Sequence, residues 1–155
     1  MGDDMKERGQ VTIEGVLIIG ILLAIFLAVS IPLAFRTKDN ARDVSLVADA
    51  RYVTERIATA ANSIVHPDEK RTIDIYVPAF SSQDENIPVT ITTDGDSLIT
   101  YIQFPTETKN ITIDLYGTNW SIYDGSTGNA GDLAESSGGR YTITITWANI
   151  TYWRQ

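Results

Sequence analysis

The feature that most constrains this chain is an uncharged, almost wholly apolar run at residues 15–35, GVLIIGILLAIFLAVSIPLAF. As a helix that rises about 1.5 Å per residue, this run spans roughly 31 Å, which matches the hydrocarbon core of a bilayer. A helix that is apolar on every side needs lipid or other helices around it. The run therefore predicts a membrane-spanning or helix-packed segment, not the core of a small soluble domain.

The composition excludes several kinds of site. The chain of 155 residues has no cysteine, which excludes disulfides, thiolate metal sites and cysteine catalysis. Its only histidine is His66, which excludes a site with several histidine ligands and argues against most hydrolase triads. The net charge of −8 argues against a nucleic-acid-binding surface.

The charges divide the chain into three parts. Residues 1–9 have a net charge of −1, residues 10–65 balance five acids against five bases, and residues 66–155 hold twelve acids against five bases, a net charge of −7. We therefore expect a short leader at 1–9, a neutral stem at 10–65 and an acidic head at 66–155. Within the stem, residues 15–35 are the hydrophobic segment and residues 36–65 are amphipathic.

The start of the chain differs from a secretory signal peptide, because the apolar run is too long and no small-x-small cleavage site follows it. Glu14 stands at the mouth of the run, where an ionisable group is costly and favours a partner. Cleavage between Gly9 and Gln10 would create an α-amine four residues away, and a neighbouring subunit's amine is a second partner for Glu14. The alternative is that Glu14 lies at headgroup level as the last polar residue before the apolar core.

The string KERGQVTIE at residues 6–14, followed by about 20 apolar residues, resembles the class III signal sequence of archaeal type IV pilins. The resemblance covers roughly residues 6–35. It implies that a membrane prepilin peptidase cuts between Gly9 and Gln10, that Glu14 serves in assembly, and that the apolar helix is retained. The acids in the leader depart from the usual positive n-region. A start at Met5 would give the leader MKERG, which fits better and leaves residues 1–4 open as native leader.

Residues 36–65 show helical periodicity. Small or apolar residues recur at spacings of 4, 3, 4, 3 and 4, which places them on one face of a helix. These are Leu46, Ala50, Val53, Ile57, Ala60 and Ile64. The helix is expected to end near His66-Pro67, because a residue before proline avoids the α region. The stripe is expected to pack either on the protein's own head or on other copies. Both are possible at once if the C-terminal half of the stem packs on the head and the N-terminal half packs on neighbouring copies.

Residues 66–155 change to the alternation of β-strands, clearest in residues 141–147, YTITITW. Asp94-Gly95 predicts a tight hairpin, and the segment 124–139 predicts a Gly/Ser/Asp-rich loop. The chain as a whole is therefore predicted to be α+β, a long N-terminal helix followed by a small antiparallel β-sandwich-like head. The strands are expected at 72–77, 88–93, 97–104, 111–116, 120–123, 141–147 and 150–153.

The head carries only weak patterns that could indicate chemistry. The loop 124–132 has aspartates and glycines but lacks the spacing and the distal glutamate of a calcium loop, so a solvated turn is the default. No signature supports a pair of catalytic carboxylates, and His66 is expected to be structural or exposed. We therefore predict no cofactor, no metal and no catalytic residue, and an enzyme is the least supported class.

Three N-glycosylation sequons lie in the head, against about 1.3 expected by chance (7 × 28/155, from the counts of Asn and of Ser plus Thr). Threonine-rich strands can generate such triplets without any glycan. If the head lies outside the cell, they become candidate glycan sites, and glycans would keep sheet edges soluble and apart. The candidates are Asn110, Asn119 and Asn149.

These patterns predict a pilin, the structural subunit of an archaeal type IV pilus-like surface filament that polymerises through its hydrophobic helix and serves adhesion. Its expected partners are other copies of itself, the prepilin peptidase, an assembly ATPase with its membrane platform, and the cytoplasmic membrane before assembly. The alternatives are a membrane-anchored surface binding or adhesion module, and an archaellin-like filament subunit. Archaellins resemble this layout, but their mature N-terminal segment is usually glycine-rich and lacks the pair that Gln10 and Glu14 form.

Overall fold

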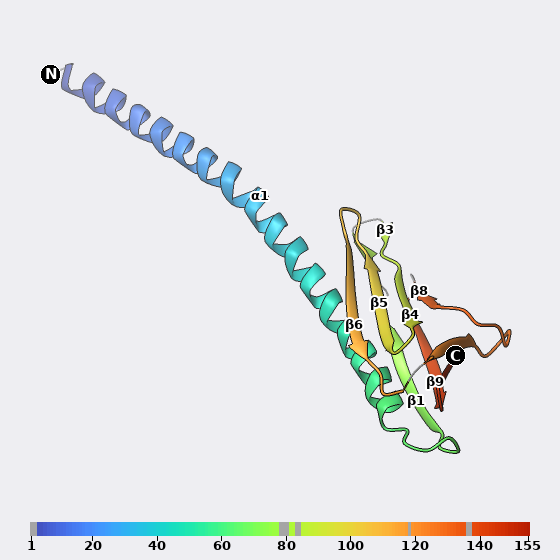
Figure 1. Cartoon of the computed structure of the whole chain (residues 1–155). Coiled ribbons are helices and arrows are strands. Elements are labelled where there is room, and N and C mark those ends of the chain that lie inside the picture. Colours follow the sequence, from blue (N-terminus) through green and yellow to red (C-terminus); the bar gives the residue numbers. More distant parts are fainter. Residues whose placement is uncertain (1–2, 78–80, 83–84, 118, 136–137) are drawn as a thin grey trace. The chain divides into compact units, whose positions relative to one another are not determined.

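The structure is a computed structural model that describes residues 3–77, 81–82, 85–117, 119–135 and 138–155 (Figure 1). The chain divides into two compact units, one that ends at Val44 and one that begins at Ser45. The first unit is helical, and the second holds the rest of the helix and all the strands. This confirms the predicted α+β class with a long N-terminal helix and a β-sheet head.

The helix α1 runs over Asp3–Asn62, a length of 60 residues, and passes through Pro32 without ending. It stops a few residues before the predicted boundary at His66-Pro67. The Ile64 N–H donates to the Ala61 carbonyl at 3.1 Å, which tightens the last turn. The carboxylate of Glu69 then accepts the backbone N–H groups of Val65 at 2.7 Å and His66 at 3.3 Å. These bonds satisfy backbone donors after the helix and hold the chain in a turn.

The strands form two four-stranded sheets and one two-stranded ribbon. The order in the first sheet is β1-β9-β10-β7, the order in the second is β6-β5-β4-β8, and β2 pairs with β3. The bounds are β1 Arg71–Val77, β2 Ser81–Ser82, β3 Glu85–Asn86, β4 Val89–Asp94, β5 Ser97–Gln103, β6 Thr108–Asp114, β7 Ser121–Asp124, β8 Leu133–Glu135, β9 Gly139–Thr146 and β10 Asn149–Arg154.

Each of the seven expected strands coincides with a strand of the head, shifted by a few residues at its ends. The pairing is antiparallel except between β10 and β7, which run parallel. The segment 124–139 is not all loop, because Leu133–Glu135 pairs with β4 as β8. Leu133 and Glu135 are buried and Ala134 between them is exposed, so burial alternates as expected for a strand. A strand of three residues is too short for this alternation to be detected in the sequence.

Two tight hairpins set the register of the head. Gly95, with φ of 65°, lies in the turn between β4 and β5 and confirms the hairpin expected at Asp94-Gly95. The turn between β9 and β10 contains Trp147 and Ala148, and Ala148 has φ of 62°. Trp147 therefore lies in the turn and is 46% exposed, so the strand expected at 141–147 ends one residue earlier, at Thr146. Tyr141, Ile143 and Ile145 form the expected buried face of the strand, and Thr144 between them is buried as well.

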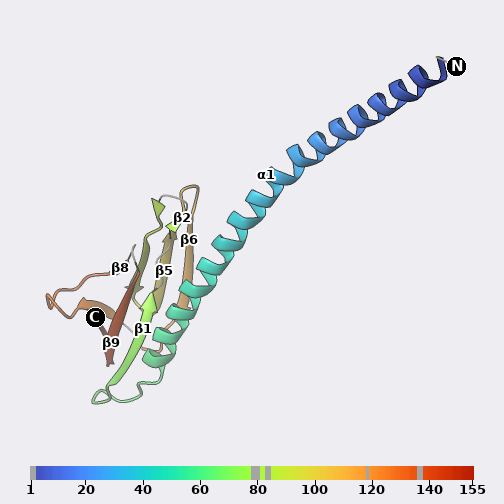
Figure 2. The same cartoon turned by 180° about the vertical axis from the view of Figure 1, so that it is seen from behind.

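The C-terminal part of α1 completes the core of the head. Five of the six predicted stripe residues are buried, and Ala60 is half-buried against the same cluster. They join buried side chains from both sheets in one hydrophobic cluster, and Figure 2 shows this part of α1 beside β1 from behind. The stripe from Leu46 to Ile64 therefore packs on the protein's own head.

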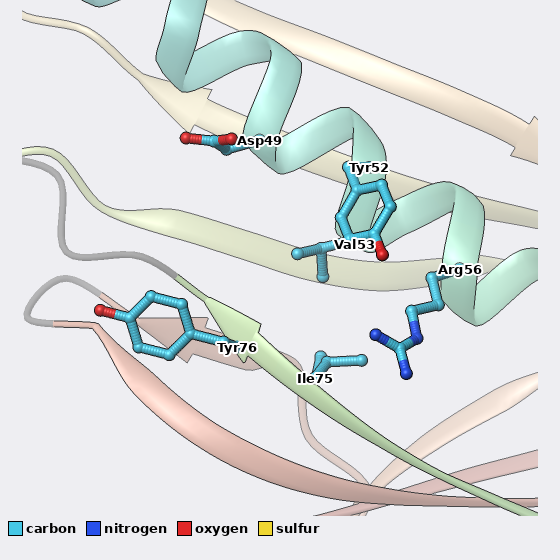
Figure 3. A pocket seen from close by; sticks show the side chains of 6 residues that line it. All are labelled: Asp49, Tyr52, Val53, Arg56, Ile75 and Tyr76. Carbon is cyan, nitrogen blue, oxygen red and sulfur yellow. The ribbon is translucent and has the colours of Figure 1, made fainter.

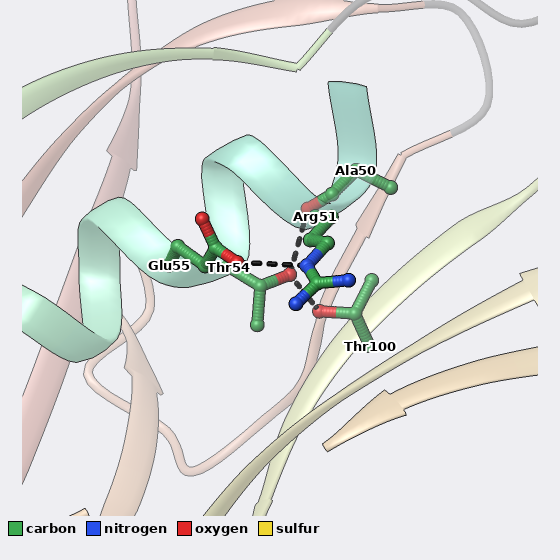
Figure 4. A network of polar contacts seen from close by, with 5 residues as sticks. All are labelled: Ala50, Arg51, Thr54, Glu55 and Thr100. Atoms are coloured by element: carbon green, nitrogen blue, oxygen red, sulfur yellow. Dashed lines mark hydrogen bonds and ion pairs between the residues drawn. The ribbon is translucent and has the colours of Figure 1, made fainter. Parts of the chain in front are cut away.

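Two polar contacts fasten this part of α1 to the second sheet. Thr54 and Thr100 are fully buried, and their hydroxyl oxygens lie 2.6 Å apart across the contact between α1 and β5 (Figure 4). Asn62, the last helical residue, donates from Nδ2 to the Asp114 carbonyl at 3.2 Å and accepts the Tyr116 N–H at 2.7 Å. In both contacts, polar groups that lose hydration on folding gain a hydrogen-bond partner within the protein.

Candidate functional site

The most distinctive surface of the first unit is the apolar segment of α1. Its large apolar side chains from Ile13 to Phe35 are exposed, from 45% for Leu27 to 67% for Ile19. None of the most apolar 18-residue window is buried within the protein. By length and composition the helix is able to cross a membrane, which makes it a candidate membrane anchor.

The predicted processing and assembly residues lie at the start of this helix. Gly9 and Gln10 fall within α1, and the side chain of Gln10 lies outside the described part of the structure. Glu14 is exposed on α1, one helical turn after Gln10. Gln10, whose α-amine the expected cleavage would free, and Glu14 therefore lie on neighbouring turns of one helix face.

The three sequon asparagines are exposed and come from different parts of the head. Asn110 lies in β6, an edge strand, opposite Tyr101 of β5. Asn119 precedes β7 in the left-handed region with φ of 63°. Asn149 opens β10, and its Nδ2 donates to the Trp147 carbonyl at 3.3 Å.

The acidic loop 124–132 uses its first aspartate to build a turn. The carboxylate of Asp124 accepts the backbone N–H of Ser126 at 2.8 Å and the Ser126 hydroxyl at 2.6 Å. These bonds lower the pKa of Asp124, since they stabilise its charged form. Across the described residues, no three or more His, Asp or Glu side chains converge as metal ligands would.

His66 is exposed in the turn after α1, beside the Glu69 carboxylate that accepts its N–H. The same two backbone bonds, from Val65 and His66, lower the pKa of Glu69. This places His66 in a structural turn.

One buried polar cluster in the head corresponds to no pattern in the sequence. Glu135 of β8 is only 5% exposed, accepts the hydroxyl of Tyr141 in β9, and lies 3.5 Å from the Arg154 guanidinium of β10. Burial and the Glu135 carboxylate raise the pKa of Tyr141 above its usual range. Because β8 and β9 belong to different sheets, the cluster ties the two sheets together. No spacing rule reveals it, since the three residues meet only through the strand order.

Comparisons with protein-family models, with curated proteins and with solved structures gave no match for this chain.

Proposed function

We propose that this protein is the structural subunit of an archaeal type IV pilus-like surface filament, built by stacking the apolar helix and serving adhesion. The observation that carries the proposal is the contrast along α1. Side chains from Ile13 to Phe35 are exposed, whereas the stripe from Leu46 to Ile64 is buried in the head. The head thus has a hydrophobic core of its own, and the apolar segment has to be covered by lipid or by other protein chains.

The resemblance of residues 6–14 to a class III signal sequence supports a route of assembly that fits this contrast. Cleavage before Gln10 removes the leader and frees an α-amine, and the apolar helix then exchanges lipid for the helices of other copies. Identical rods that contact one another through different faces make heterologous contacts, which generate a helical filament where the rotation between copies does not close a ring. Removal from lipid requires work, so a prepilin peptidase, an assembly ATPase and a membrane platform are proposed partners. The glycan candidates and the acidic head would then face the cell exterior.

The test is to shear surface material from cells that express the chain, then fractionate it and image it by negative-stain microscopy. The subunit of a filament is expected in the sheared fraction as fibres. A chain that stays in the membrane pellet with no fibres supports the anchored adhesion module instead. Fibres whose loss stops swimming support the archaellin-like alternative.

Two substitutions in the apolar segment separate anchoring from assembly. Leu23→Arg costs about 2.5–3.5 kcal/mol on insertion scales and is expected to abolish filaments. Phe26→Ala keeps the segment apolar but removes an aromatic ring that is 66% exposed on the helix. It is expected to leave the amount of membrane-bound protein unchanged and to reduce filament yield. Normal filament yield from Phe26→Ala would mean that the ring makes no contact that assembly requires.

A further inference from the structure

Surface hollows occur in both units of the chain. Two hollows of the head lie between α1 and β1, with volumes of about 320 Å³ and about 480 Å³. Side chains of both charges line them, Asp49 and Arg56 in the first (Figure 3) and Glu55, Arg56 and Arg71 in the second. These hollows therefore favour neither an anion nor a cation. The hollow of the first unit differs, because Arg36 is the only charged side chain among the described residues that line it.

This hollow, of about 280 Å³, lies on the apolar segment of α1. It is lined by Ala28, Val29, Pro32, Leu33 and Arg36, whose spacing places them on one face of the helix. Ala28 has only a methyl group, so space is left beside the larger side chains of Val29 and Leu33, which are exposed. The hollow is therefore an apolar trough that ends at a guanidinium group.

The length of the apolar run sets the depth of Arg36 when the helix crosses a membrane. Residues 15–35 span roughly 31 Å, which matches the hydrocarbon core, and Arg36 is the first residue after them. Arg36 is thus expected at the level of the lipid phosphates. The aliphatic part of an arginine side chain can lie along apolar surface while its charged end stays among polar groups.

The charge of Arg36 is not neutralised within the described part of the chain. No carboxylate there lies within ion-pair distance of its guanidinium group. The next acid, Asp39, comes three residues farther from the apolar segment, about 4.5 Å along the helix axis. A guanidinium group binds a phosphate through two parallel hydrogen bonds, so the charge of this end of the hollow is complementary to a lipid phosphate.

We propose that the face of α1 from Ala28 to Arg36 binds one anionic phospholipid. Its phosphate pairs with Arg36, and part of an acyl chain fills the hollow beside Pro32. This inference rests on the apolar segment crossing a membrane, which the proposed filament subunit and the anchored adhesion module have in common. It does not depend on filament formation. In a filament, the helix of another copy would have to replace this lipid.

The bound lipid can be measured by native mass spectrometry of the full chain. The chain is reconstituted in vesicles of equal parts phosphatidylcholine and phosphatidylglycerol and is then extracted in a mild detergent. The wild-type chain is expected to keep a single phosphatidylglycerol in preference to phosphatidylcholine. Retention of both lipids equally, or of neither, would overturn the inference.

Two matched pairs of variants test the two parts of the site. Arg36→Gln is expected to lower the preference at least about tenfold, the effect of losing a hydrogen bond between charged groups. Lys38→Gln removes the same charge about 200° around the helix and is expected to leave the preference near its wild-type value. Ala28→Phe fills the hollow and is expected to release the lipid. Ala34→Phe, outside the hollow and on the opposite side of the helix from Pro32, is expected to retain it.

Circular dichroism in the same detergent checks that each variant keeps its helix. Equal losses of lipid within either pair would overturn the inference and leave the proposed function standing, because filaments are tested separately on sheared surface material. Retention as expected from a chain that makes no filaments would support the lipid site and contradict the filament. A chain that does not enter the vesicles would overturn both the inference and the membrane-bound stage of the proposed function.

Discussion

The buried hydroxyl pair between α1 and β5 supports a quantitative prediction about how the helix is held to the head. Thr54 Oγ1 lies 2.7 Å from the Ala50 carbonyl and 2.6 Å from Thr100 Oγ1. A hydroxyl has a single proton, and a carbonyl only accepts. The Thr54 proton therefore goes to Ala50, and Thr100 is the donor in the contact between the two threonines.

This assignment makes the two valine substitutions unequal. Thr54→Val removes the acceptor of the Thr100 hydroxyl and leaves that donor buried, which costs about 1–3 kcal/mol of unfolding free energy. Thr100→Val leaves Thr54 still bonded to Ala50, so the expected loss is under about 1 kcal/mol. The double variant removes both hydroxyls and is expected to be less destabilised than Thr54→Val alone, because no donor is left unsatisfied.

The assay is urea denaturation, followed by circular dichroism, of a fragment that lacks residues 1–35. This fragment is expected to be soluble, folded and monomeric because the unit from Ser45 onward has its own core. Thr59→Val is the matched control, since Thr59 is exposed on the same helix, and it is expected to stay within about 0.5 kcal/mol of wild type. Equal losses from the two buried substitutions, or a Thr54→Val loss no larger than the control, would refute the donor assignment. A fragment that builds filaments of native diameter would show that the head polymerises and that the stem is only an anchor.

Three further predictions concern the native host. Intact mass or N-terminal sequencing is expected to show a mature chain of 146 residues, cut between Gly9 and Gln10, and a surface product that retains residues 6–9 would contradict it. Glu14→Ala is expected to leave processing intact and to reduce filament yield if Glu14 pairs with a neighbour's terminal amine, whereas a normal number of filaments favours the headgroup position. Native filaments are expected to carry at least one N-glycan, and a mass equal to the unmodified 146-residue polypeptide would rule it out. The candidate sites are Asn110, Asn119 and Asn149.

The parts of the fold that were predictable from the sequence are those governed by local periodicity. The stripe from Leu46 to Ile64 identifies the buried face of α1 because spacings of three and four residues correspond to one face of a helix. The strand Gly139–Thr146 shows its buried face in the same way, through the alternation of large apolar residues with threonine. Both patterns depend on one element at a time.

What could not be predicted depends on which elements meet. The parallel pairing of β10 with β7 and the cluster of Glu135, Tyr141 and Arg154 arise from the strand order. Arg56 of α1 and Arg71 of β1 are a further case, because both look like ordinary solvated charges in the sequence. They line one surface hollow only because β1 ends the first sheet beside α1.

The division of α1 also explains how one subunit can be stable in two surroundings, if the proposed function is correct. When the apolar segment moves from lipid to other helices, protein replaces lipid around the side chains from Ile13 to Phe35. It leaves in place the stripe and the polar contacts at Thr54 and Asn62, because these are satisfied within the unit that begins at Ser45. The free energy of folding of the head is therefore expected to be nearly independent of assembly. Under the proposed function, filament formation then requires no refolding of the head, and its free energy is expected to come mainly from the stem.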